Sequence, residues 1–210
     1  MIAAGQSLYE EKIFDELKKN PDIIVLSTDN TLKYVLEQNI IPEYTCMQEN
    51  LIRPKDQYDF FPDFFYHGII KSHADKITLY YSQLVSPERL KIFNEMGFKI
   101  VPFVRLGKGT GKGETIDTAG NCGMALVQIA RHILKIDKIA ILGIDLDYTT
   151  SWKAFTDKPH ILDPMLNNTK HKLTCDYFES GTPIFNLTRL GNLHGKGIKE
   201  SNIIDFIENE

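Results

Sequence analysis

The chain has 210 residues, of which 42% are hydrophobic and 25% charged, with a formal net charge of -4. These values are typical of a soluble globular protein, and the negative net charge does not indicate nucleic-acid binding through a broad positively charged surface. No apolar run approaches the roughly 20 residues of a membrane-spanning helix, and the first residues lack the regions of a signal peptide. The cysteines Cys46, Cys122 and Cys175 have neither zinc-site nor redox-pair spacing, so we expect reduced thiols in a cytoplasmic protein.

Short apolar runs alternate with helical patterns along the chain. Residues 51–76 break the pattern and predict an irregular insertion or short helices near the sheet edge, and residues 149–170 predict a loop or lid. The expected order is strand 1–5, helix 7–20, strand 22–28, helix 30–40, strand 43–48, strand 76–81, helix 86–97, strand 98–104, glycine-rich loop 105–117, helix 121–135, strand 138–144, helix 171–180, strand 183–187 and helix 200–210.

Strands that alternate with helices indicate an α/β layered fold with a mainly parallel sheet, here expected as a single domain over residues 1–210. Such sheets bind ligands outside the carboxyl ends of their strands. The residues that follow each expected strand are therefore the first candidates for a functional site.

Polar or flexible residues follow the first two strands. Gly5 allows a tight turn and Ser7 opens a helix, whose first N–H groups could hold a phosphate. Alternatively, the glycine only lets the strand and the helix pack closely. After the second strand, Asp29 or Asn30 caps the next helix. Alternatively, Asp29 contacts a ribose, a base or a metal at the mouth of the sheet.

The third strand ends in Gln48, Glu49 and Asn50, which place three polar groups after an apolar run. These residues either begin an ordinary loop or supply Glu49 as an acid that binds a metal or orients a ligand. The later sequence "GKGTGKGET" departs from the Walker A spacing and predicts a flexible loop. The two lysines of that loop, Lys108 and Lys112, would suit a flap over phosphates.

The stretch "DTAGNCGMALVQIA", residues 117–130, passes from small residues to an apolar helical pattern. Thr118 or Asn121 can cap the helix and leave backbone donors that point at an anion. Gly120 and Gly123 let the backbone approach a ligand or a neighbouring strand. The apolar stripe that follows is expected in the core and consists of Met124, Val127, Ile133 and Leu134.

Further candidates lie beyond the strand 138–144. Asp145 and Asp147 share one face of an extended chain, so they could bind Mg²⁺ together with phosphates. Alternatively, Asp145 accepts hydrogen bonds from backbone groups of the loop, and Asp147 is solvated. His160 and His171 lie in or near the expected lid, where either one could act as a general acid or base.

Four blocks in this order resemble the 6-hydroxymethylpterin pyrophosphokinase (MptE-like) family, which includes the Rossmann-like domain of motility accessory factors. The blocks are "AAGQSL", "DIIVLSTDNTLKYVLEQNIIPEY", "TAGNCGMALVQIARHILKIDKIAILGIDLDY" and "PIFNLTRLGNLHGKGI". They cover most of the chain except residues 51–76. Bacterial sialyltransferases with a related fold show similar "GxSL" and "SGIDF"-like blocks.

The resemblance implies a Rossmann-like three-layer sandwich, with a C-terminal lid, that binds a nucleotide at the carboxyl edge of the sheet. By position, it assigns nucleotide contacts to Gly5, Gln6, Ser7, Asp29, Gly120 and Asn121, and an acidic role to Asp145. The archaeal pyrophosphokinases carry an Asp-rich motif after the third strand, where this chain has "MQENL" and Glu49 would substitute.

Three functions follow as expectations. The first is transfer of diphosphate from ATP to a pterin alcohol with Mg²⁺ as cofactor, the metal being held by Glu49, Asp145 and Asp147. The second is a glycosyltransferase that uses a CMP-activated nonulosonic acid and a glycan acceptor, with His160 or His171 as base. The third is a non-catalytic nucleotide- or glycan-binding module. The sequence leaves open whether the protein forms a homo-oligomer.

Overall fold

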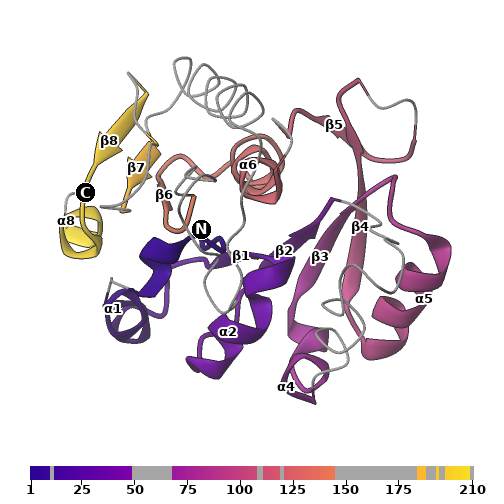
Figure 1. Ribbon diagram of the computed structural model, residues 1–210, viewed down its shortest axis with the longest axis horizontal. Coiled ribbons are helices and arrows are strands. Elements are labelled where there is room, and N and C mark those ends of the chain that lie inside the picture. Colours follow the sequence, from indigo (N-terminus) through magenta and orange to yellow (C-terminus); the bar gives the residue numbers. More distant parts are fainter. Residues whose placement is uncertain are drawn as a thin grey trace.

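The fold is seen in a computed structural model (Figure 1). It describes residues 1–9, 12–48, 68–107, 111–118, 121–144, 184–187, 193 and 197–208. The expected lid 149–170, the expected helix 171–180 and residues 51–67 of the expected insertion lie outside these ranges. The described remainder of that insertion forms two short helices, α4 (Gly68–Lys71) and η3 (Ala74–Lys76).

Every strand pairing in the described part of the chain is parallel, as the sequence predicts for this α/β fold. Five strands form one sheet in the order β1-β2-β3-β4-β5, and three form another in the order β6-β7-β8. The strands are β1 (Leu26–Thr28), β2 (Tyr44–Met47), β3 (Thr78–Ser82), β4 (Lys99–Arg105), β5 (Glu114–Ile116), β6 (Ile139–Ile141), β7 (Ile184–Asn186) and β8 (Ile198–Glu200).

The first residues of the chain join these two sheets into one layer. Ile2 forms parallel bridges to Ser27 on one side and to Leu142 on the other. Its N–H donates to the Leu26 carbonyl at 2.8 Å, and the Ala3 N–H donates to the Leu142 carbonyl at 2.8 Å. The expected strand 1–5 is therefore present as a short central connection between β1 and β6.

Helices cover both faces of this layer and give three layers in all (Figure 1). The helix α6 lies on one face, where Met124, Leu126 and Val127 are completely buried in a core with Leu26 and Cys46. Two further cores fill the opposite face beneath the other helices. The helices are η1 (Gln6–Tyr9), α1 (Ile13–Lys19), η2 (Asp29–Thr31), α2 (Leu32–Glu37), α5 (Pro87–Met96), α6 (Cys122–Gln128), a π-helical turn (Ile129–Ile133) and α8 (Ile203–Glu208).

Local chemistry explains where several helices begin. In α5, Ser86 accepts a hydrogen bond from the Arg89 N–H at 3.4 Å and Pro87 occupies the first turn. The expected helix 7–20 is instead divided into η1 and α1. Ser7 does not cap α1 as expected, because it is buried inside η1 and α1 follows Lys12.

Two strands correct the sequence-based expectations. The stretch 105–117, expected to be a loop, contains β5, which pairs with β4. Gly113 explains this pairing: it has a φ of 104°, and a Cβ there would lie 2.1 Å from the Pro102 carbonyl oxygen, so the chain turns back closely onto β4. The strand β8 was not expected, and its polar "IKE" sequence gives little β signal.

The order of the strands reverses at the segment that contains Ile2. From this segment the chain continues to β1 and on to β5 in one direction, and then returns to β6 on its other side. The helix α6, which precedes β6, lies on the face opposite to α1 and α2 (Figure 1). Parallel sheets bind ligands in the crevice outside the carboxyl ends of the strands at such a switch point. No helix in the described part of the chain has both the length and the apolar character that crossing a membrane requires.

The turn at Gly143 offers a test of this central connection. Gly143 has a φ of 78°, and a Cβ there would lie 2.1 Å from the Ala3 carbonyl oxygen. We expect Gly143→Ala to lower the free energy of unfolding by at least about 2 kcal/mol in urea titrations.

Gly68→Ala is the matched control, because a Cβ at Gly68 meets nothing within 4 Å. It should change the free energy of unfolding by no more than about 0.5 kcal/mol. Equal stability of the two variants would contradict the close approach of residues 3 and 143.

Candidate functional site at the carboxyl edge

The backbone of the first loop meets the backbone of the turn after β6 at the switch point. The Gly5 N–H donates to the Gly143 carbonyl at 2.8 Å, and the Leu8 N–H donates to the Gly5 carbonyl at 3.2 Å as η1 begins. Ser7 is buried, with 1% of its surface exposed. The turn predicted at Gly5 is thus held against the carboxyl end of β6, where a ligand of a parallel sheet would bind.

Asp29 follows β1 at the same edge and is 8% exposed. Asp29 is the first residue of η2, and its carboxylate accepts a hydrogen bond from the N–H of Asn30 at 2.9 Å. The residue at the N-cap of α2 is Thr31, so neither Asp29 nor Asn30 caps that helix. A buried carboxylate at a strand end is costly unless it has polar partners, and the Asn30 N–H is one such partner.

Asn121 is the N-cap of α6, one of the two residues that the sequence offers for this role. Its Oδ1 accepts the Met124 N–H at 2.8 Å, and its own N–H donates to the Thr118 carbonyl at 2.9 Å. Within the described residues, the Asn121 side-chain nitrogen is buried and has no hydrogen-bond partner. An amide donor left unpaired in this way is a group that a polar ligand could satisfy.

Hydrogen bonds fix the start of α6 to the ends of β2 and β3. The Gln48 side-chain nitrogen donates to the Asn121 carbonyl, and the Ser82 hydroxyl donates to the Gln48 carbonyl. The Ser82 oxygen also accepts the Leu84 N–H at 3.2 Å. Gln48 and Ser82 are both almost completely buried. They position Asn121. The sequence marked Gln48 as a polar residue after an apolar strand but did not single out Ser82, whose signal would have been its place directly after the strand 76–81.

The Asp29 carboxylate acts electrostatically on Cys46, a thiol at the same junction. Burial raises the pKa of Cys46 well above its usual value, and the hydrogen-bonded Cys122 thiol and the Asp29 carboxylate raise it further. Cys46 therefore remains a neutral thiol. The Gln48 bond joins the end of β2 to the start of α6, and the charge of Asp29 acts on Cys46 at the same junction.

The structure thus brings together Gly5, Ser7, Asp29, Thr118 and Asn121 at one edge. Gln6 begins η1 at this edge. The remaining candidates lie outside the described residues: Glu49, Gly120, Asp145, Asp147, His160 and His171. Gln48 and Ile144 are the last described residues before Glu49 and Asp145, and both belong to this edge. Among the residues that the structure describes, no group of three acidic, histidine or cysteine side chains could hold a metal ion.

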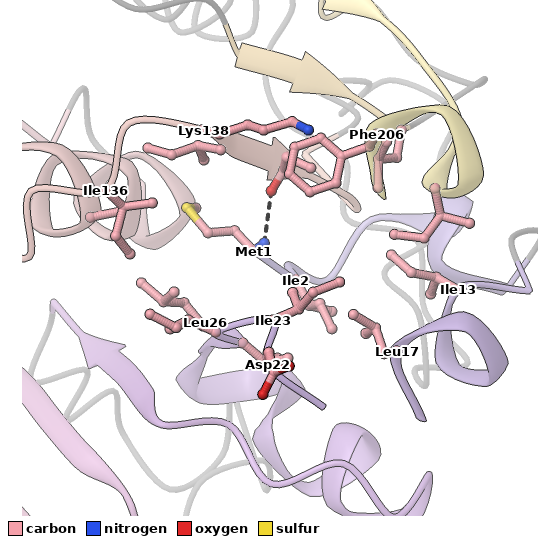
Figure 2. Close-up of a pocket in the computed structure, with 17 residues that line it drawn as sticks. Met1, Ile2, Ile13, Leu17, Asp22, Ile23, Leu26, Ile136, Lys138 and Phe206 are labelled. Atoms are coloured by element: carbon pink, nitrogen blue, oxygen red, sulfur yellow. Dashed lines mark hydrogen bonds between the residues drawn. The ribbon is translucent and has the colours of Figure 1, made fainter. Parts of the chain in front are cut away.

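A cavity of about 260 Å³ lies at the opposite, amino edge of the sheet (Figure 2). Its walls are mostly apolar and include Ile13, Leu17, Ile23 and Ile136. Met1 and Ala140 both line it, and the Met1 nitrogen donates to the Ala140 carbonyl at 2.7 Å. This cavity lacks the convergent polar groups of the carboxyl edge, so we place the functional site at the carboxyl edge.

The cap at Asn121 can be tested by stability. Asn121→Ala removes the acceptor of the Met124 N–H, and we expect a loss of about 0.5–2 kcal/mol in the free energy of unfolding. Asn94→Ala, at an exposed position on α5, is the matched control and should change stability by less than about 0.5 kcal/mol. Unchanged stability of Asn121→Ala in chemical denaturation would contradict the cap.

Comparisons with known proteins add a family and a fold. The family model described as 6-hydroxymethylpterin diphosphokinase MptE-like matches residues 1–151, which include the strand ends and the α6 start described above. Comparison with curated proteins gives no match.

A solved structure of the MAf glycosyltransferase from Magnetospirillum magneticum AMB-1 resembles the whole chain, with a TM-score of 0.57 and 14% identity over 99% of this chain. The chain spans 35% of the length of that protein. This likeness supports the Rossmann-like fold, and the family match covers more than half of the chain. The chain therefore belongs to the 6-hydroxymethylpterin diphosphokinase MptE-like family.

Proposed function

We propose that the protein is a nucleotide-dependent transferase that binds its nucleotide at the carboxyl edge of the sheet. The observation that carries this proposal is the meeting of the Gly5 loop, Asp29 and the Asn121 cap at the topological switch point. The family match supports it, because the matched region contains all three elements and because a diphosphokinase is a transferase.

Each element has a distinct part in binding. Backbone N–H groups at the starts of η1 and α6, around Gly5–Ser7 and Thr118–Asn121, would hold phosphate oxygens. Asp29 would accept a hydrogen bond from the ribose, as acids at this position of nucleotide-binding sheets do. The buried side-chain nitrogen of Asn121 would donate to a phosphate or to the base.

The most concrete reaction is diphosphate transfer from ATP to a 6-hydroxymethylpterin-like alcohol. The alcohol oxygen attacks the β-phosphorus, the bond to the α-phosphate oxygen breaks, and AMP leaves. The alcohol gives its proton to a base, for which the carboxylates Glu49 and Asp145 are candidates. The chain's main task is to hold the two substrates in line, because positioning and charge stabilisation dominate such reactions.

Mg²⁺ is part of this proposal through acids that lie outside the described residues. The described residues offer Asp29 but no three-group metal site, so they do not form a Mg²⁺ site by themselves. Glu49, Asp145 and Asp147 would hold the ion, whose oxygen-ligand preference they match. Bound Mg²⁺ would neutralise the charge of the phosphates.

A glycosyltransferase that uses a CMP-activated nonulosonic acid is the alternative. The similarity of the whole chain to a MAf glycosyltransferase structure favours it. In this reaction CMP leaves from the sugar, and His160 or His171 would accept the proton of the attacking glycan hydroxyl. The same edge would bind the nucleotide in both reactions, so the leaving nucleotide distinguishes them.

The nucleotide can be identified by thermal unfolding and product analysis. At about 100 times its dissociation constant, ATP with Mg²⁺ should raise the Tm by about 5–10 °C, and it should yield AMP only when the pterin alcohol is present. Stabilisation by CMP and a CMP-sugar, with release of CMP, would support the glycosyltransferase instead. No stabilisation by any of these nucleotides would overturn both.

The metal-binding acids can be tested separately. Glu49→Gln and Asp145→Asn should each weaken ATP binding in the presence of Mg²⁺ by about tenfold or more, measured by calorimetry, and should have little effect in EDTA. Asp15→Asn, on the exposed surface of α1, is the control and should bind as the wild type does. Wild-type affinity of both site variants would exclude their proposed role.

A further inference from the structure

Two exposed leucines follow neighbouring strands at the carboxyl edge. Leu84 comes two residues after the end of β3 and is 40% exposed, and Leu106 comes directly after β4 and is 62% exposed. Both lie in turns, where glycine, proline and short polar residues are usual. A single exposed leucine needs no explanation, but these two follow paired parallel strands, where such a sheet presents its ligand-binding residues.

Hydrogen bonds hold the two turns side by side. The Gln83 N–H donates to the Phe103 carbonyl at 3.1 Å, and the Gln83 side-chain oxygen accepts the Arg105 N–H at 3.0 Å. Leu84 directly follows Gln83, and Leu106 directly follows Arg105. The two exposed leucines are therefore fixed at neighbouring positions of the edge.

A chain of hydrogen bonds links Leu84 to the Asn121 cap of the candidate site. The Leu84 N–H donates to the Ser82 oxygen at 3.2 Å, and the Ser82 hydroxyl donates to the Gln48 carbonyl. The Gln48 side chain then donates to the Asn121 carbonyl. Because Ser82 and Gln48 are almost completely buried, the turn after β3 keeps a fixed position relative to the start of α6.

Leu106 is linked to the same cap through β5. Its N–H donates to the Ile116 carbonyl at 2.9 Å. Two residues further on, the Thr118 carbonyl accepts the Asn121 N–H at 2.9 Å. The strands β1 and β2 separate these turns from the Gly5 loop at the switch point. A second substrate that lay over the turns would thus be next to a nucleotide held by the Asn121 cap.

We propose that Leu84 and Leu106 form the acceptor subsite of the transferase, on which a planar, uncharged heteroaromatic ring that carries the reacting alcohol lies. This inference rests on the proposed function and assigns the place of its second substrate. A flat ring removes the apolar surface of both leucines from water, whereas a hydroxyl-rich glycan needs polar partners that they do not offer. A stable protein interface needs roughly 800 Å² per partner, far more than two leucines supply.

Methyl NMR of the full chain tests the subsite directly, with ¹³C-labelled leucine methyl groups and 6-hydroxymethylpterin as the probe. Leu84→Met and Leu106→Met assign the two sets of signals by removing them. With and without an ATP analogue and Mg²⁺, the ring current of a stacked pterin should move both sets upfield. Leu17, which lines the amino-edge cavity, should keep its signals. Lactose, which has no aromatic ring, should leave all three unchanged.

Affinity measurements give a second readout that depends on the side chains themselves. Leu84→Ser and Leu106→Ser should each raise the Kd for the pterin alcohol, measured from its fluorescence, by about fivefold or more, because each removes apolar contact with the ring. Both should keep the rise in Tm that ATP and Mg²⁺ produce. Ile204→Ser, at a similarly exposed position on α8, is the matched control and should bind the pterin alcohol as the wild type does.

The inference and the proposed function can fail separately. Pterin that leaves the Leu84 and Leu106 signals in place, lactose that moves them, or wild-type affinity of both serine variants would overturn the subsite, even if a nucleotide stabilises the protein. Conversely, leucine shifts with pterin but no stabilisation by any nucleotide would support the subsite and overturn the nucleotide-dependent reaction.

Discussion

The placement of residues 1–3 between β1 and β6 is the constraint on which the rest of the structure depends. The hydrogen bonds of Ile2 and Ala3 to Leu26 and Leu142 make one layer of two sheets. The Gly143 turn lets the backbone of β6 approach Ala3 closely enough for these bonds. If residues 1–3 did not lie between β1 and β6, the Gly5 loop would not lie beside the ends of these two strands, and the switch point would not exist.

The same layer separates two edges of different character. At the carboxyl edge, buried polar groups converge: Asp29 after β1, Gln48 after β2, Ser82 at the end of β3 and Asn121 before α6. At the amino edge, apolar side chains line the cavity shown in Figure 2. Burying polar groups costs free energy, so their concentration at one edge is the arrangement expected of a site that binds a polar ligand.

The sequence predicts the order of most elements because apolar runs and helical patterns report local burial. It places β1 too early, since the N–H of Val25 donates to the Glu43 carboxylate at 2.7 Å before the strand begins. It misses β5 because the approach of Gly113 to Pro102 is a tertiary contact.

The candidate site shows the same division between local and tertiary information. The cap at Asn121 follows from local chemistry and could be predicted. The bond from Gln48 to Asn121 joins segments that are distant in the sequence, so neither spacing nor periodicity could reveal it.

Nucleotide binding at the carboxyl edge can be located by hydrogen–deuterium exchange of the protein with and without a stabilising nucleotide. We expect slower exchange in peptides that cover residues 4–8, 28–31 and 118–124, with no change at the amino edge. Protection confined to residues 22–26 and 136–140, which line the apolar cavity, would contradict it.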